Sequence, residues 1–276
     1  MQQAVRHARL AGDRRAETRN LMSLALSALY GPMPVAEAIA VGQSMASGVT
    51  DDRRAEGVVL CALAHLHALR GDFDEARALY SKARETLEEL GGKVMAATVS
   101  LDSGRVELLA DRPDQAEAEL RLDYDVLSAI GERYTLSTIA GLLADAVLRQ
   151  GRVDEAIALS VECEEATADD DVESQSLWRR VRARALAERG EMDEALRLSE
   201  EAYQLVAETD APLLRGGNLV DLATVRAAAG RLDDAAAAGR EALELFEAKG
   251  DEVDAGTTRA ILERIAAEVA RPRSRL

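Results

Sequence analysis

The chain has 276 residues, of which 47% are hydrophobic and only 3% aromatic, and its formal net charge is −16. This excess of acid argues against a nucleic-acid partner, because phosphate binding needs a clustered basic face. No apolar run approaches the ~18 residues of a membrane span, and the N-terminus lacks the apolar core of a signal peptide. Cys61 and Cys163 fit neither a disulfide framework nor a zinc pattern. We therefore expect a cytoplasmic protein without a membrane contact, a cofactor or a metal.

A six-residue motif recurs along the chain and sets its organisation. It reads GDFDEA at 71–76, and its copies begin at residues 31, 71, 111, 151, 190 and 230. The step between copies is 40 residues, shortened once to 39 between 151 and 190. A period this regular indicates a repeat architecture, in which each unit contacts mainly its neighbours.

The second copy shows what the motif does. After it, Ala76, Leu79, Tyr80 and Ala83 recur three or four positions apart, which indicates one apolar stripe on a helix. Gly71 ends the helix before the motif, since a residue with positive φ closes a last turn without a Cβ clash. The acidic residues that follow suit the free N–H groups of the next helix. The motif is therefore the turn of a helical hairpin, and its final alanine lets two helices approach closely.

A second, looser turn separates the hairpins, as at 249–251. Alternating the two turns predicts helices at 13–30, 34–47, 51–70, 74–90, 93–110, 114–130, 132–150, 154–168, 172–189, 193–208, 212–229, 233–249 and 252–270. We expect an all-α, right-handed superhelical solenoid of antiparallel helix hairpins that forms one domain over 1–276. It consists of six hairpins at 13–250, a capping helix at 251–270 and a frayed tail at 271–276.

The N-terminal residues have the pattern of an incomplete unit. The segment 10–13 has the form of the turn between hairpins, so residues 1–12 fit the end of a second helix whose first helix is missing. We therefore expect a partial N-terminal repeat, and we interpret the chain as part of a longer array.

These positions resemble the tetratricopeptide repeat family. In the second hairpin the family pattern is matched by Ala64, Gly71, Phe73, Ala76, Tyr80 and Ala83. The first hairpin departs from it, with Leu24 at the small position and Gln43 at the last alanine. The 40-residue repeat is similar to the C-terminal repeat regions of large bacterial ATP-binding regulators, of the LuxR or the adenylate/guanylate cyclase type. The resemblance implies a protein–protein interaction or signal-sensing module of such a regulator.

Catalytic and metal-binding patterns are missing from the sequence. His65 and His67 are two residues apart on a helix and point to different sides, whereas chelating pairs are three or four apart. The segment 91–94 lacks the spacing and the hydroxyl of a phosphate-binding loop. The many paired carboxylates fit solvated helix ends. We expect no enzyme.

The resemblance implies that the first helices of the hairpins line a concave groove. By this register, the groove positions six residues before the hairpin turns are His65, Arg105, Asp145, Arg184 and Thr224. The groove position ten residues before a hairpin glycine is Arg180. The arginines are suited to bidentate carboxylate binding, so a peptide or a partner's helix is the expected ligand. The same stripe also fits a solvated inner face with internal salt bridges and no ligand.

Other functions stay open at this stage. The chain could instead associate with itself and oligomerise its parent protein, or sense a small molecule. The only tryptophan, Trp178, fits either an exposed anchor at a binding site or a side chain that fills a gap between hairpins.

Overall fold

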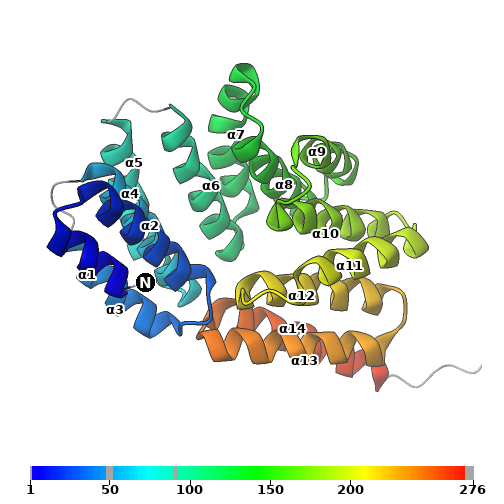
Figure 1. Cartoon of the computed structure of the whole chain (residues 1–276). Coiled ribbons are helices and arrows are strands. Elements are labelled where there is room, and N and C mark those ends of the chain that lie inside the picture. The colour runs from blue at the N-terminus through cyan, green and yellow to red at the C-terminus, as the bar shows by residue number, and fades with distance from the viewer. Residues whose placement is uncertain (1, 48–51, 90–92, 271–276) are drawn as a thin grey trace, which may run out of the picture.

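A computed structural model describes residues 2–47, 52–89 and 93–270. Helices, and no strands, make up the regular structure of these residues: α1 (Gln2–Ala11), α2 (Arg14–Tyr30), α3 (Val35–Ala46), α4 (Arg53–Leu69), α5 (Phe73–Glu88), α6 (Lys93–Leu109), α7 (Pro113–Ile130), α8 (Tyr134–Arg149), α9 (Val153–Ala166), α10 (Val172–Glu188), α11 (Met192–Val206), α12 (Pro212–Ala228), α13 (Leu232–Lys249) and α14 (Glu252–Val269). They stack as antiparallel hairpins in a right-handed superhelical solenoid (Figure 1), which confirms the predicted fold class.

The predicted helices correspond to α2–α14 with small shifts at their ends. At α4, for example, the helix begins at Arg53 because the Asp52 side chain accepts hydrogen bonds from the backbone N–H groups of Arg54 and Ala55, both at 3.1 Å. The expected start at 51, the turn at 90–92 and the frayed tail at 271–276 lie outside the described residues.

The hairpin turns have the backbone conformation that their glycines predict. Gly71 has φ +83°, in the left-handed region that favours glycine. In the third copy, Asp111 takes this position with φ +54°, which is tolerated because a short polar side chain can bond locally. The first copy differs, since Gly31 is extended (φ −78°, ψ −177°) and two prolines follow it.

Alanines at the end of the motif are fully buried in five of its six copies. The last five, Ala76, Ala116, Ala156, Ala195 and Ala235, are all 0% exposed, so the helices of each hairpin touch there as expected. In the first copy, Ala36 is exposed instead. Trp178 is buried among the side chains of α8–α11, and Arg179 and Arg182 lie over its ring at 4.0 and 4.5 Å. It is therefore a core residue.

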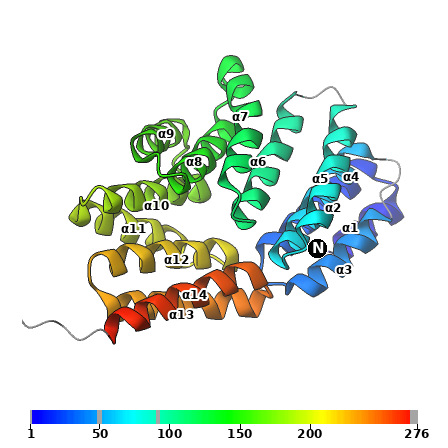
Figure 2. The ribbon, with the colours of Figure 1, turned by 180° about the vertical axis from the view of Figure 1, so that it is seen from behind.

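The solenoid curves through one turn and meets itself. Figures 1 and 2 both show α13 and α14 beside the N-terminal hairpins, and α14 contacts α4. At the contact, the Lys249 ammonium is buried and donates hydrogen bonds to the carbonyl oxygens of Ala28 at 2.9 Å, Gly31 at 2.8 Å and Met33 at 2.7 Å. We call these four groups the Lys249 clasp.

The sequence around α2 explains why a lysine fits there. The last carbonyls of any helix lack partners within that helix, and Pro32 and Pro34 have no N–H with which to supply them. The ammonium group at the end of α13 provides three donors instead. The clasp thus closes the solenoid into a ring and encloses its inner face. Among the described helices, none is both long enough and apolar enough to span a membrane.

Candidate functional site on the inner face

Polar side chains from α2, α4, α6 and α10 meet at one side of the inner face, in a group that we call the Arg105 cluster (Tyr30, His65, Asp102, Arg105 and Glu173). Arg105 donates through Nη2 to Glu173 Oε1 at 2.5 Å and through Nη1 to the Tyr30 hydroxyl at 3.3 Å. The His65 ring lies edge-on to Tyr30, with the ring centroids 6.4 Å apart. The Nε–H of Arg105 is buried and has no hydrogen-bond partner among the described residues.

Burial determines the charges in this cluster. It lowers the pKa of His65 to about 3, together with the positive charges of Arg105 and Lys249, so the imidazole is neutral. Burial also raises the pKa of Asp102 to about 6, against the attraction of Arg105. Arg105 therefore stays positively charged, and its charge lowers the pKa of both His65 and Asp102.

A second group, the Asp145 cluster, links α8, α10 and α12 through alternating charges (Arg149, Asp145, Arg184, Asp221 and Arg180). The buried Asp145 accepts from Arg149 at 3.1 Å and from Arg184. Asp221 lies 3.2 Å from Arg184 Nε and 3.1 Å from Arg180 Nε. Burial opposes ionisation of Asp145, but the three arginines outweigh it and hold its pKa well below the usual range.

The nitrogen–oxygen distances to Asp221 are short, but these contacts are not hydrogen bonds. Neither Arg180 Nε nor Arg184 Nε has a hydrogen bond with acceptable geometry among the described residues, and the same holds for Asp221 Oδ2. Three inner-face arginines, Arg105, Arg180 and Arg184, therefore each retain an N–H that is buried without a hydrogen bond, which costs free energy.

The structure places the residues chosen from the sequence in different surroundings. Arg105, Asp145, Arg180 and Arg184 lie in the two clusters, and His65 packs against Tyr30. Thr224 joins neither cluster, being exposed with its hydroxyl donating to the Val220 carbonyl oxygen of its own helix. The groove assignment needs side chains within reach of a ligand, whereas His65 and Asp145 are buried. Asp145 is surrounded by arginines of α8 and α10, and the His65 ring packs against Tyr30 of α2.

Several members of the clusters were missed from the sequence. Tyr30, Arg149, Glu173 and Asp221 lie at other distances from the hairpin glycines than six or ten residues. The signal that could have found Arg149, Glu173 and Asp221 is a charged residue within a first helix, at any position. Such residues are frequent on solvated faces too, so this signal alone would also have selected many exposed side chains.

The polar groups of the two clusters are joined mainly by ion pairs. Among the described residues, no three His, Cys, Asp or Glu side chains come together to hold a metal ion. Burial raises the pKa of both Cys61 and Cys163, which disfavours the nucleophilic thiolate. What remains is a set of guanidinium groups, whose natural ligands are carboxylates.

Comparison with known proteins identifies the repeat. Two family models, both described as tetratricopeptide repeat, match residues 56–122 and 177–201. The chain is a tetratricopeptide-like repeat protein. No curated protein sequence matches it.

Solved structures share the fold of this tetratricopeptide-like protein. The Rap conjugation gene regulator of plasmid pLS20, in complex with a Phr peptide, is 16% identical with a TM-score of 0.61, over 84% of this chain and 68% of that one. NprR in complex with its cognate peptide NprX is 12% identical with a TM-score of 0.59, over 95% and 76%. A signal transduction ATPase with a tetratricopeptide repeat sensor, from Pyrococcus horikoshii, is 14% identical with a TM-score of 0.55, over 83% of this chain but 36% of that one. At such identities the likeness concerns the fold alone.

Proposed function

We propose that this protein is a non-enzymatic interaction module of a larger bacterial regulator, and that its inner face binds an acidic peptide or helix of a partner protein. The observation that carries the proposal is the buried, incompletely bonded state of Arg105, Arg180 and Arg184. A carboxylate brought by a ligand can complete the hydrogen bonds that the internal acids leave unmade. Two of the structures with a similar fold are themselves complexes with peptides.

We expect a ligand carboxylate to bind at Arg105 first. Its partner Glu173 retains 42% exposure of the side chain, so this ion pair is within reach of solvent. Asp145, by contrast, is 2% exposed and held by two arginines. A ligand carboxylate therefore displaces Glu173 from Arg105 more easily than it displaces Asp145 from Arg184.

The experiment starts from peptides selected on the immobilised protein from a display library, with affinities measured by fluorescence anisotropy. Glu173→Gln removes the competing carboxylate and should tighten binding of an acidic peptide. Arg105→Gln should weaken it about 10-fold or more, since a hydrogen bond to a charged group contributes about 1.5–3 kcal/mol. The matched control is Arg197→Gln, because Arg197 is exposed and pairs with Glu194 and Glu201 on α11.

Two results would contradict the proposal. One is a set of selected peptides without acidic residues. The other is an equal affinity of the Arg105→Gln, Glu173→Gln and Arg197→Gln variants for an acidic peptide.

A further inference from the structure

Two aspartates occupy the same register position in different hairpins. Asp102 lies nine residues before the turn position held by Asp111, and Asp221 lies nine residues before Gly230. Each is on a first helix, α6 or α12, that contacts the first helix of the preceding hairpin, α4 or α10. The surroundings of Asp221 therefore show what the repeat can place against an acid at this position.

The two aspartates differ in the side chains that the preceding first helix offers them. At Asp221, the positions ten and six residues before the turn hold Arg180 and Arg184, whose Nε atoms lie 3.1 and 3.2 Å from its carboxylate oxygens. The same positions on α4 hold Cys61 and His65. Neither is a cation, because Cys61 is a thiol and burial lowers the pKa of His65 to about 3. The preceding helix thus gives two guanidinium groups to Asp221 and no positive charge to the acid on α6.

Asp102 accepts no hydrogen bond in the part of the chain that the structure describes, although it is half-buried. Arg105 attracts its charge, but the hydrogen bonds of Arg105 go to Glu173 and Tyr30. The Tyr80 hydroxyl of α5 is also buried without a hydrogen-bond partner among the described residues. Burial raises the pKa of Tyr80 and the charge of Asp102 adds to the effect, so the two groups are close. An acid and a hydroxyl that both lack a bonded partner among these residues therefore lie together between α4, α5 and α6.

The charges around Arg105 do not balance when a purely acidic ligand binds. In the unliganded protein one guanidinium faces two carboxylates, those of Glu173 and Asp102. A ligand carboxylate adds a third, and carboxylates that share a site repel one another. A ligand that brings a cation together with its carboxylate restores the balance, because the cation lies against Asp102 and against the Glu173 that the carboxylate displaces.

We propose that Asp102 is a cation-binding subsite of the inner face, so that the ligand carries a basic residue close to the acidic residue that binds Arg105. This inference rests on the proposed function and specifies its ligand as a peptide of mixed charge. The basic group takes the place that the arginines of α10 take at Asp221, and the Tyr80 hydroxyl oxygen accepts a further hydrogen bond from it. A guanidinium fits best, because the protein itself uses this group at the equivalent position.

The spacing of the two subsites sets the spacing of the two charges in the ligand. Asp102 and Arg105 are three residues apart on α6, which places their Cβ atoms about 5–6 Å from each other. In an extended peptide, side chains on the same face are two residues and about 7 Å apart. In a helical peptide, residues three or four apart share a face. The acid and the base should therefore be two residues apart in an extended ligand and one turn apart in a helical one.

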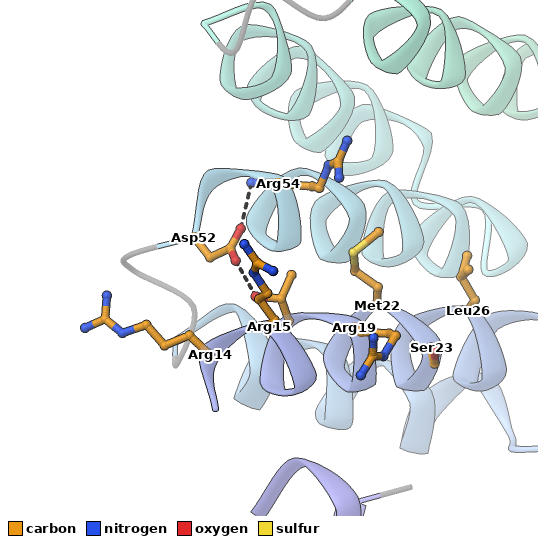
Figure 3. Close-up of a pocket in the computed structure, with 9 residues that line it drawn as sticks. Arg14, Arg15, Arg19, Met22, Ser23, Leu26, Asp52 and Arg54 are labelled. Atoms are coloured by element: carbon orange, nitrogen blue, oxygen red, sulfur yellow. Dashed lines mark hydrogen bonds between the residues drawn. The ribbon is translucent and has the colours of Figure 1, made fainter. Parts of the chain in front are cut away.

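A second basic surface also attracts acidic peptides and has to be distinguished from this subsite. The exposed Arg14, Arg15 and Arg19 line a depression of about 650 Å³ along α2 (Figure 3). Their charge favours any acidic peptide and gives no reason for a basic residue beside the acid. Arg19→Gln is therefore a control for binding at this depression.

Peptide selection from a display library on the parent chain and on its variants tests the proposal. On the parent, the selected peptides should carry an arginine or a lysine close to the acidic residue. On Asp102→Asn the acidic residue should remain and the basic one should disappear, whereas on Arg105→Gln the acidic residue should disappear. Asp74→Asn, at an exposed position on α5, and Arg19→Gln should select the same peptides as the parent. Circular dichroism checks that each variant is folded.

Affinities of the selected peptide, measured by fluorescence anisotropy, isolate the charge pair. Its basic residue is replaced by an uncharged one of similar shape, citrulline for arginine or norleucine for lysine. This change should weaken binding to the parent about 10-fold or more, since a hydrogen bond to a charged group is lost. It should make no difference on Asp102→Asn, nor on Cys61→Arg, which places a guanidinium at the position equivalent to Arg180.

The outcomes separate this inference from the proposed function. Selected peptides that are acidic but carry no basic residue overturn the inference and leave the proposed function intact. A basic residue that is selected equally on Asp102→Asn overturns the inference as well. Peptides without acidic residues, or loss of the acidic residue on Arg19→Gln, contradict the proposed function and the inference together.

Discussion

Replacing Lys249 by methionine tests whether the clasp holds the ring closed. The substitution keeps the apolar stem of the side chain and removes its three donors. The carbonyl oxygens of Ala28, Gly31 and Met33 then lose their only ammonium partner within 2.7–2.9 Å. We expect the contact between α13 and the turn after α2 to open while the hairpins themselves stay folded.

The size of the effect is a difference between two large contributions. The Ala28 bond is buried and those to Gly31 and Met33 are half-buried, so leaving the three carbonyls without a donor costs at most about 3–9 kcal/mol, at about 1–3 kcal/mol for a fully buried group. Against this, burial lowers the pKa of Lys249 from 10.5 to about 8, so removing the buried charge returns about 3 kcal/mol at 1.36 kcal/mol per pKa unit. The carbonyl contribution is the larger, and the net loss should be about 3 kcal/mol.

Hydrogen exchange and small-angle X-ray scattering measure the opening. Amides of α14 and of the segment 28–34 should exchange faster in Lys249→Met, amides of α8–α11 should be unchanged, and the radius of gyration should increase. The matched control is Lys82→Met, because Lys82 is exposed and lies 3.6 Å from Glu56. If Lys249→Met and Lys82→Met gave the same exchange and the same scattering, the clasp would not hold the ring.

Three further predictions concern the core and the turns. Ala195→Arg should lower the free energy of unfolding by several kcal/mol, since Ala195 is 0% exposed, whereas Glu88→Arg on an exposed position should leave urea unfolding unchanged. Because the folded pKa of His65 is about 3 and the unfolded one 6.5, stability is lost as pH falls below 6.5. Between pH 6.5 and 4.5 the free energy of unfolding of the parent should therefore fall by up to about 3 kcal/mol more than that of His65→Leu, as measured by urea unfolding. An equal pH dependence of the two chains would contradict this. Gly190→Ala should cost about 1–2 kcal/mol in the same assay, because φ is +82° there although a Cβ meets no clash, and an unchanged midpoint would show that the turn relaxes.

The helices and turns could be predicted from the sequence because their causes are local. Gly71, the acids after it and Ala76 act within a few residues, and repetition of the motif confirms each assignment independently. The fold class followed for the same reason, since a solenoid is built from contacts between neighbouring repeats. The first copy departed because Pro32 and Pro34 replaced the usual turn, and there Ala36 is exposed and Gly31 extended.

The inner face could be predicted only in part. Counting from the hairpin glycines found Arg105, Asp145, Arg180 and Arg184, because those positions share one side of their helices. It could not show that the ring closes, since closure depends on a curvature summed over many hairpins and on a single side chain, Lys249, 218 residues from its partner Gly31. Burial of His65 and Asp145 depends on side chains of neighbouring helices, such as Tyr30 and Arg184, and was missed as well.

Closure and recognition on the inner face oppose each other. If a ligand binds only the open ring, and the clasp favours the closed ring by about 3 kcal/mol, then the open form is populated at roughly 1 part in 150, and the apparent affinity falls by the same factor. Lys249→Met removes this penalty without touching Arg105. The variant should therefore bind an acidic peptide up to about 100-fold more tightly than the parent, mainly through faster association, as measured by stopped-flow anisotropy. An unchanged rate and affinity would mean that a ligand reaches Arg105 past Glu173 in the closed ring, and that the clasp stabilises the fold without controlling access.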